Sequence, residues 1–254
     1  IEQQLLTGLE IGPQSALPGE MARQLCALIG MERATFCNTG SEAVMGAVRA
    51  ARTVTGRQRI VYGSGDYHGV NDEVLAKGQT FQGKMRTVPI APGIPADMVS
   101  QVTVLPYGEE SSLATLRAEA GNLAAVLVEP VQSRRPDLQP RDFLQAVREI
   151  TRQAGTALIF DEVITGFRVH PGGAQAWFGI KADIATYGKI IGGGLPIGVI
   201  AGSHEYLDAF DGGAWQYGDD SVPEAGVTFF AGTVVRHPQA MVAAQAVMKR
   251  FADA

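Results

Sequence analysis

The chain has 254 residues, which is enough for one large domain or two small ones. Apolar residues make up 46% and charged residues 19%, a balance that can bury a sizeable core. The formal net charge is -5 and no long basic run occurs, which argues against nucleic acid and anionic membrane surfaces as main partners.

The sequence contains no apolar stretch of membrane-spanning length, and its N-terminus lacks the pattern of a signal peptide. The chain begins without Met, as a fragment of a longer protein would. Cys26 and Cys37 both stand in apolar surroundings, which predicts buried thiols and neither a disulfide nor a metal pair. We therefore expect a reducing, cytoplasmic location.

Helix-like and strand-like patterns alternate along the first part of the chain. Apolar residues recur at helical spacing over 18–30 and over 41–55, and a glycine ends each run. Short apolar runs at 34–37 and 60–62 predict strands. Gly and Pro interrupt the pattern between 63 and 121, where we expect loops.

The alternation resumes in the second half. Strands are predicted at 124–128, 157–160, 184–188 and 196–202, and helices at 141–154 and 239–252. Strands that are apolar throughout, separated by amphipathic helices, predict an α/β domain with a mainly parallel sheet flanked by helices. Because such sheets bind ligands beyond the carboxyl ends of their strands, the residues that follow each strand are the candidates for a site.

The first candidate is the turn 38–41, which leads from a strand into a helix. Its small residues leave backbone N–H groups at the helix start free for an anion, and the hydroxyls of Thr39 and Ser41 add donors. The same residues are typical helix caps, which is the alternative without a function.

The second candidate is the run Asp66-Tyr67-His68-Gly69 after the strand at 60–62. An aromatic ring at a strand end can stack on a flat ligand, although Tyr67 could equally serve packing. His68, taken alone, is more typical of a hydrogen-bonded structural histidine.

The third candidate is the pair Asp161 and Glu162, which follows the strand at 157–160. A carboxylate at a buried strand end is unfavourable unless a cation pairs with it, and a pyridinium nitrogen is one such cation. The alternative is an ion pair with Arg168. A metal site is disfavoured because no His or Cys stands nearby at ligand spacing.

The fourth candidate is Lys189, which lies between a strand-like run and the glycines at 192–194. Burial would lower the pKa of its amine and make it a nucleophile, and the glycines would let backbone approach a ligand closely. The alternative is a solvated lysine before a flexible turn. In chain order, the four candidates supply a phosphate cradle, a ring stacker, a pyridinium partner and a lysine for a Schiff base.

Longer segments carry a family resemblance. They are FCNTGSEAVMGAVRAAR (36–52), DYHG (66–69), LVEPVQ (127–132), ALIFDEVITGFRV (157–169), GAQAWFGIKADIATYGKIIGGGLPIG (173–198) and AGTVVRHPQAM (231–241). In these segments the chain resembles the class III, fold type I aminotransferases that depend on pyridoxal 5'-phosphate (PLP), especially the glutamate-1-semialdehyde aminomutase branch. The resemblance implies a PLP-binding large domain over 1–238. It also implies that 239–254 leads toward a C-terminal small domain that is mostly absent.

The resemblance also assigns roles to single residues. It places the cofactor phosphate on Thr39, Gly40 and Ser41, and the pyridine ring against Tyr67 and Val163. His68 and Glu129 belong to the same cofactor-binding set, Asp161 pairs with the ring nitrogen, and Lys189 forms the Schiff base. Thr233 reaches the phosphate of a neighbouring subunit, which implies a homodimer with shared sites.

Two departures from the aminomutase branch refine the expected function. That branch has a Gly-Asn pair shortly after Glu-Pro-Val, where this chain has Gln132-Ser133-Arg134-Arg135, and the stretch before Thr233 also differs. Both features resemble aminotransferase domains of polyketide and non-ribosomal peptide assembly lines. Such domains aminate a β-keto acyl chain held on an acyl carrier protein.

We therefore expect an aminotransferase that moves an amino group from an amino-acid donor to a keto or aldehyde acceptor. The alternatives are a glutamate-1-semialdehyde-type 2,1-aminomutase and, from another class, a non-catalytic scaffold domain of a megasynthase. A nucleotide-binding P-loop protein is excluded because the G-x-x-x-x-G-K-[ST] run does not occur.

Overall fold

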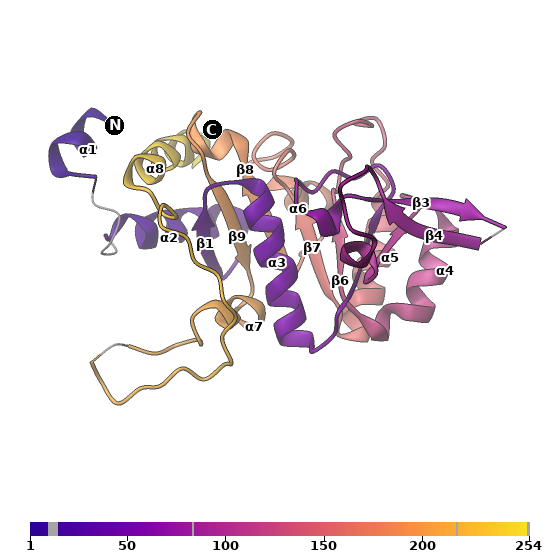
Figure 1. The fold of residues 1–254 in the computed structure, drawn as a ribbon. Coiled ribbons are helices and arrows are strands. Elements are labelled where there is room, and N and C mark those ends of the chain that lie inside the picture. Colours follow the sequence, from indigo (N-terminus) through magenta and orange to yellow (C-terminus); the bar gives the residue numbers. More distant parts are fainter. Residues whose placement is uncertain (10–14, 83, 217, 253–254) are drawn as a thin grey trace.

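The computed structural model describes residues 1–9, 15–82, 84–216 and 218–252. Its centre is a seven-stranded sheet with the order β1-β9-β8-β7-β6-β2-β5 (Figure 1). These strands are β1 (Arg33–Cys37), β2 (Arg59–Gly63), β5 (Val102–Leu105), β6 (Leu123–Val128), β7 (Ala157–Asp161), β8 (Ile184–Gly188) and β9 (Gly198–Gly202). β9 is antiparallel to both of its neighbours and the other pairings are parallel, which confirms the mainly parallel sheet.

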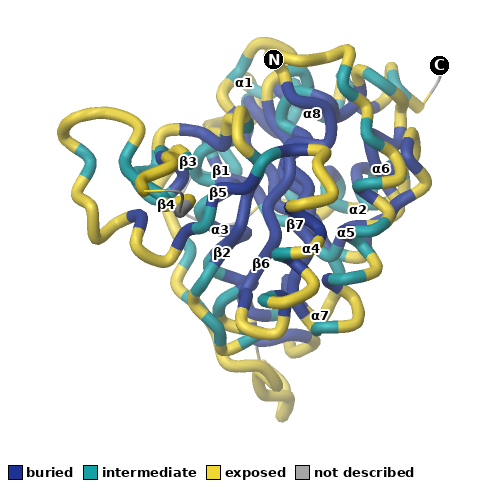
Figure 2. Tube along the Cα trace, turned by 90° about the vertical axis from the view of Figure 1, so that its right-hand side faces the viewer, coloured by how far each residue is buried: buried dark blue, intermediate teal, exposed yellow. Residues whose placement is uncertain are grey.

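Helices cover both faces of this sheet. One face packs against α3 (Gly40–Thr55) and α7 (His204–Leu207). The other packs against α2 (Leu17–Ile29), α4 (Glu110–Glu119), α5 (Arg141–Ala154), α6 (Gly173–Phe178) and α8 (Pro238–Ala252). Successive strand residues alternate between the two hydrophobic clusters because side chains of a strand point to opposite faces. The strands therefore form the buried interior seen in Figure 2.

The predicted helices end where glycines were expected to end them. Gly30, Gly56 and Gly155 follow α2, α3 and α5 and adopt left-handed backbone with φ of 70°, 67° and 59°. Glycine adopts this conformation without steric strain, so it is favoured directly after a helix. Met21, Leu25 and the other apolar residues of these helices face the core, as their spacing predicted.

The expectation of loops between 63 and 121 holds for only part of that stretch. This stretch contains β5, α4 and a separate hairpin of β3 (Ala76–Phe81) and β4 (Lys84–Pro89), which projects from the body (Figure 1). β5 has only four residues, and α4 buries little more than Leu113 and Leu116, so neither produces a strong periodic signal. The hairpin is defined by cross-strand pairing, which leaves no mark on local periodicity.

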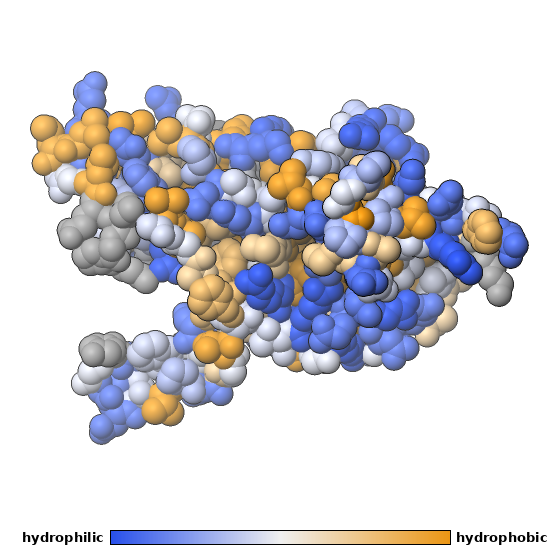
Figure 3. Space-filling model, in the orientation of Figure 1, coloured by the Kyte–Doolittle hydropathy of each residue, from blue (hydrophilic) through white to orange (hydrophobic). Residues whose placement is uncertain are grey.

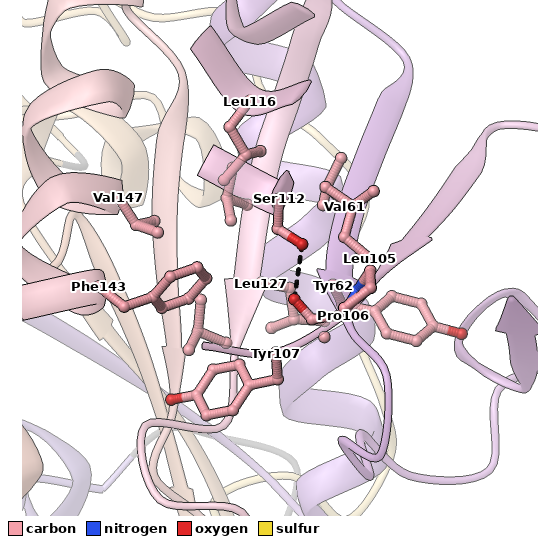
Figure 4. A pocket seen from close by; sticks show the side chains of 13 residues that line it. Val61, Tyr62, Leu105, Pro106, Tyr107, Ser112, Leu116, Leu127, Phe143 and Val147 are labelled. Atoms are coloured by element: carbon pink, nitrogen blue, oxygen red, sulfur yellow. Dashed lines mark hydrogen bonds between the residues drawn. The ribbon is translucent and has the colours of Figure 1, made fainter. Parts of the chain in front are cut away.

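A small apolar cavity of about 20 Å³ lies inside the core between the sheet, α4 and α5 (Figure 4). Tyr107 and Phe143 line it, and their rings meet edge to face with centroids 5.5 Å apart. Ser112 beside it donates its hydroxyl to the carbonyl of Pro106 at 2.6 Å. Both the size and the lining are those of a packing gap.

An exposed arm follows α7, with described residues 214–216 and 218–229. These residues form neither helix nor strand, and the arm extends away from the body (Figures 1 and 3). Trp215, Val222, Val227 and Phe229 expose 42%, 71%, 60% and 79% of their surface. Arg49 of α3 donates to the carbonyl of Phe229 at 2.5 Å and ties the returning end of the arm to the body.

The last helix, α8, packs against α2 and against the 3-10 turn Lys189–Gly192 that follows β8. Phe251 of α8 stacks on Phe167 with ring centroids 5.2 Å apart. Residues 253–254, the end of the helical segment predicted at 239–254, lie outside the described residues. No helix in the described part of the chain is both long and apolar enough to cross a membrane.

Candidate active site

The predicted site residues converge at one edge of the sheet. β1, β2, β6, β7 and β8 run in the same direction, so their carboxyl ends meet at that edge. A cavity of about 160 Å³ lies there, lined by Gly40, Ser41, Tyr67, His68, Gly69, Glu129, Asp161, Val163, Ile164 and Lys189. Every residue assigned to the cofactor lines it except Thr39 and Thr233.

The N-terminus of α3 forms one end of this cavity. Thr39 caps the helix: its hydroxyl accepts from Glu42 N at 3.1 Å, while the Glu42 carboxylate accepts from Thr39 N at 3.1 Å. The alternative reading of Thr39 as a cap is therefore correct. The N–H groups of Gly40 and Ser41 precede the first intrahelical bonds and remain available to an anion.

Gly40, Ser41 and Gly69 leave little spare room beside the helix start. A Cβ added at Gly40 would lie 3.0 Å from a methyl group of Val163. Ser41 Oγ accepts from Val70 N at 3.1 Å and keeps its hydroxyl proton for donation. Gly69 has a φ of 100°, and a side chain there would overlap Ser41. These contacts hold the backbone donors of α3 against the cavity.

Tyr67 and Glu129 lie together on the cavity wall. Tyr67 exposes 48% of its surface, which suits a ring that contacts a ligand at the cavity mouth. Its backbone N–H donates to Glu129 Oε2 at 3.2 Å, and Ser133 N donates to Glu129 Oε1 at 2.9 Å. Burial raises the pKa of Glu129 despite these donors. Glu129 thus connects the loop after β2 with the loop after β6.

Asp161 ends β7 with its carboxylate held by three groups. His68 Nδ1 lies 2.8 Å from Oδ2, while Val163 N and Thr186 Oγ1 donate to Oδ1 at 3.1 and 3.2 Å. His68 is buried and hydrogen-bonded, and it also lines the cavity, while its predicted role in cofactor binding stays a prediction. Asp161 is therefore oriented by its neighbours and presented to the same space as Lys189.

Glu162 points away from the cavity. Ala174 N and Gln175 N at the start of α6 donate to its carboxylate at 2.5 and 3.2 Å, and Thr165 Oγ1 donates at 3.3 Å. Burial raises the pKa of Glu162 to about 7, although these donors oppose the rise. Consecutive residues of extended backbone project to opposite sides, which separates Glu162 from Asp161.

The alternative ion pair with Arg168 is wrong. The Arg168 guanidinium donates to the backbone carbonyls of Ile164 and Val163 at 2.5 and 3.4 Å. Arg168 thus fastens the turn after β7 and leaves the Asp161 carboxylate to face His68.

Lys189 follows β8 directly and lines the cavity. The residue is exposed in the described chain, so the expected burial of its side chain is wrong. The residue stands at the open edge of the sheet, where the next residues already form a turn. Its φ of 49° is uncommon for a residue with a side chain, and such strained backbone concentrates at functional sites.

Thr233 is exposed and lies in a turn beyond the arm. It does not line the cavity within the described chain. Its predicted contact with a neighbouring subunit stays a prediction.

Several residues in or next to the cavity were not predicted from the sequence. Gly69 and Ile164 line the cavity, and both adjoin residues that the motifs do identify. Thr186 touches Asp161 from inside β8, where it looks like any strand threonine. Asp66 and Gln132 lie behind the cavity. Asp66 could have been noticed as the carboxylate of the DYHG motif, and Gln132 as the first residue that departs from the family pattern after Glu-Pro-Val.

The chemistry of these groups fits PLP. Backbone N–H groups and a hydroxyl at the start of α3 suit a phosphate, and an oriented carboxylate suits a protonated ring nitrogen. A primary amine in the same cavity suits an aldehyde.

Comparison with known proteins agrees with this reading. The family model for aminotransferase class-III matches residues 3–254. A glutamate-1-semialdehyde 2,1-aminomutase of Methanococcus maripaludis is 38% identical over 253 residues, which cover 96% of this chain and 56% of that protein.

Solved structures show the same fold. An omega-transaminase from Sphaerobacter thermophilus superposes with a TM-score of 0.88 at 34% identity, covering 98% of this chain and 56% of that one. A transaminase with PLP bound superposes with a TM-score of 0.85 at 32% identity, covering 97% of this chain and 56% of that one. The chain spans about half the length of these relatives. It belongs to the class III aminotransferase family and has the PLP-transferase fold of its structural neighbours.

Proposed function

We propose that this chain is the PLP-binding part of an aminotransferase that moves an amino group from an amino-acid donor to a keto or aldehyde acceptor. The observation that carries the proposal is the placing of Asp161 and Lys189. They follow the adjacent strands β7 and β8 and line one cavity with the N-terminus of α3. A PLP-bound structural relative supports the same cofactor.

Each group has a task in this reaction. The N–H groups of Gly40 and Ser41 bind the phosphate, and Tyr67 and Val163 contact the ring. Asp161 keeps the ring nitrogen protonated, and the cofactor, when bound, supplies the electron sink.

Lys189 performs the proton transfer. Its Nζ would hold the aldehyde of the cofactor and, as a free amine, would accept the proton from the α-carbon of the amino donor. Because the amine starts within the site, it is already oriented for this step.

Absorbance and an amino-donor assay test the proposal. The chain with PLP should show the absorbance of a lysine-bound cofactor, and an external amino acid should convert it to the pyridoxamine form. Borohydride reduction should fix the cofactor on Lys189, Lys189→Ala should abolish the linkage, and Lys181→Ala is the matched exposed control. Reduced cofactor on Lys77, Lys84, Lys181 or Lys249 would refute the assignment.

The second candidate function is a 2,1-aminomutase, which the name of the Methanococcus maripaludis relative favours. Such an enzyme rearranges one substrate and needs no separate donor. Gln132 and the arginines that follow it, where that branch has Gly-Asn, count against this candidate. Conversion of the bound cofactor by an external amino acid favours the transferase. Conversion by glutamate 1-semialdehyde alone favours the mutase.

A homodimer with shared sites is part of the proposal. The arm exposes Trp215, Val222 and Phe229, which is a large apolar surface for a monomer to leave in water. Thr233 directly follows the arm, and its hydroxyl would donate to the phosphate of the partner subunit. The large domain would then end near residue 238, with α8 leading toward a small domain.

We also propose a β-keto acyl chain on an acyl carrier protein as the acceptor. Its support is the departure after Glu129, where Arg134 and Arg135 are exposed and offer cationic groups to a carrier. Cys26 and Cys37 are both free thiols, which supports a reducing, cytoplasmic location. Turnover with an acyl carrier substrate would separate this acceptor from free keto acids, and a protein that binds no PLP would be a scaffold.

A further inference from the structure

A second carboxylate lies behind the cavity. The Asp66 side chain is fully buried, yet it does not line the cavity. Its Oδ2 accepts from Gly63 N at 3.1 Å and from Glu129 N at 3.4 Å. The same oxygen lies 3.4 Å from His68 Nε2. Asp66 therefore occupies the far side of His68, opposite to Asp161.

The His68 ring is held between these two carboxylates. Nδ1 faces Asp161 at 2.8 Å and Nε2 faces Asp66, while the Tyr62 ring meets the imidazole edge to face with centroids 5.5 Å apart. Burial alone would lower the pKa of His68, but the hydrogen bond to Asp161 and the negative charges of Asp161 and Asp66 outweigh it and raise the pKa to about 10. His68 Nε2 forms no hydrogen bond within the described chain, so its 3.4 Å approach to Asp66 is an ion pair, which needs a protonated ring.

Gln132 fixes the position of Asp66. Gln132 is fully buried, and its Nε2 donates to Asp66 Oδ1 at 2.5 Å and to the carbonyl of Ser64 at 2.9 Å. Because both neighbours are acceptors, only the amide orientation that presents the NH₂ group satisfies them. Gly65 lies over this amide with a φ of 94°, and a Cβ there would be 3.3 Å from it.

We propose that Asp66 is a positioning residue of the cofactor site, held by Gln132, which keeps the His68 ring doubly protonated and thereby fixes the Asp161 carboxylate. These four residues form a chain of contacts from Gln132 through Asp66 and His68 to Asp161, which we call the relay. Its consequence for the cofactor rests on the proposed function, whereas the protonation of His68 does not. Asp66 and Gln132 are not among the residues that line the cavity, and they act through His68.

The protonation of His68 can be measured without cofactor. In ¹⁵N-¹H spectra of the native chain, the ring assigned by comparison with His68→Asn should carry a proton on both nitrogens at pH 8. A neutral ring at pH 8 would overturn the proposal, and this measurement needs no variant of Asp66.

The variant Asp66→Asn removes one carboxylate and keeps the size of the side chain. His68 should then titrate at least one pH unit lower, a tenfold or greater loss of proton affinity. The matched control is Asp97→Asn, an exposed carboxylate of the 3-10 helix Ala96–Val99, which should leave the titration unchanged. An unaltered titration in folded Asp66→Asn would show that Asp161 alone holds the ring and would overturn the relay.

With PLP bound, the pH dependence of its absorbance should move in Asp66→Asn in the same direction as the His68 titration. A purely structural role would reduce the amount of bound cofactor without moving this pH dependence, and that result would overturn the relay. Failure to bind PLP in the native chain would instead refute the proposed function, while the cofactor-free spectra would still decide the protonation of His68.

Discussion

Replacing Glu162 by Gln should change how the stability of the chain depends on pH. Glu162 is 1% exposed, and burial raises the pKa of its carboxyl from the ordinary 4.5 to about 7. At pH values between 4.5 and about 7, the Glu162 carboxyl keeps its proton in the folded chain and has lost it in the unfolded chain. Unfolding then releases a proton, so the free energy of unfolding falls as the pH rises through this window.

The size of the effect follows from the two pKa values of Glu162. A tenfold change in proton affinity corresponds to about 1.4 kcal/mol, so the window from 4.5 to 7 corresponds to about 3 kcal/mol. A glutamine at this position keeps one acceptor for the N–H groups of α6 and cannot titrate. The stability of the native chain minus that of Glu162→Gln should therefore fall by about 3 kcal/mol across the window and stay level above it.

Urea unfolding at constant ionic strength, followed by circular dichroism between pH 4 and 8, measures this difference. Titrations common to both chains, including that of His68, cancel in the subtraction. Glu149→Gln, an exposed carboxylate on α5, is the matched control and should show no such trend. Parallel stability curves for the native chain and Glu162→Gln would refute the reasoning.

Three further outcomes are expected. Asp161→Ala should retain the cofactor, because the start of α3 is intact, but lose nearly all transaminase activity, and retention of most activity would contradict its role. Gly198→Ala should lower the free energy of unfolding by about 1–3 kcal/mol, since its Cβ would overlap the backbone carbonyl of Thr39 at the start of α3. In the control Gly19→Ala the new Cβ meets nothing within 4 Å, and the same urea experiment should show no loss of stability. Thr233→Ala should weaken cofactor binding roughly ten- to a hundredfold. In a heterodimer of Thr233→Ala with Lys189→Ala chains, one site should remain fully competent, and weakened binding at every site would show that Thr233 acts within its own subunit.

The strands and the site edge were predictable because each buried strand is an apolar run followed at once by polar residues. The cavity brings the predicted Ser41, Tyr67, Asp161 and Lys189 together, since parallel strands deliver their carboxyl ends to one edge. The orientation of the Glu162 side chain was harder to predict, because it depends on the position of the N-terminus of α6, whose N–H groups bind the carboxylate.

Contacts between residues that are far apart in the sequence could not be predicted from local sequence patterns. The approach of Asp66 to His68 and Gln132 is decided by how the loops after β2 and β6 cross. The exposure of Lys189 likewise depends on the turn that carries it away from β8. A lysine beside an apolar run looks the same in sequence whether that turn covers it or opens it to solvent.

The packing of α8 on the turn Lys189–Gly192 has a consequence for biosynthesis. Val247 lies so close that a Cβ added at Gly193 would be 3.1 Å from its methyl group, so the helix shapes the turn that bears the lysine. A ribosome releases the sheet strands well before it releases this helix, and domains acquire such long-range contacts last. The strained lysine thus receives its support only after α8 has left the ribosome. Nascent chains shorter than this would hold the start of α3 in place before the turn that bears Lys189 is supported.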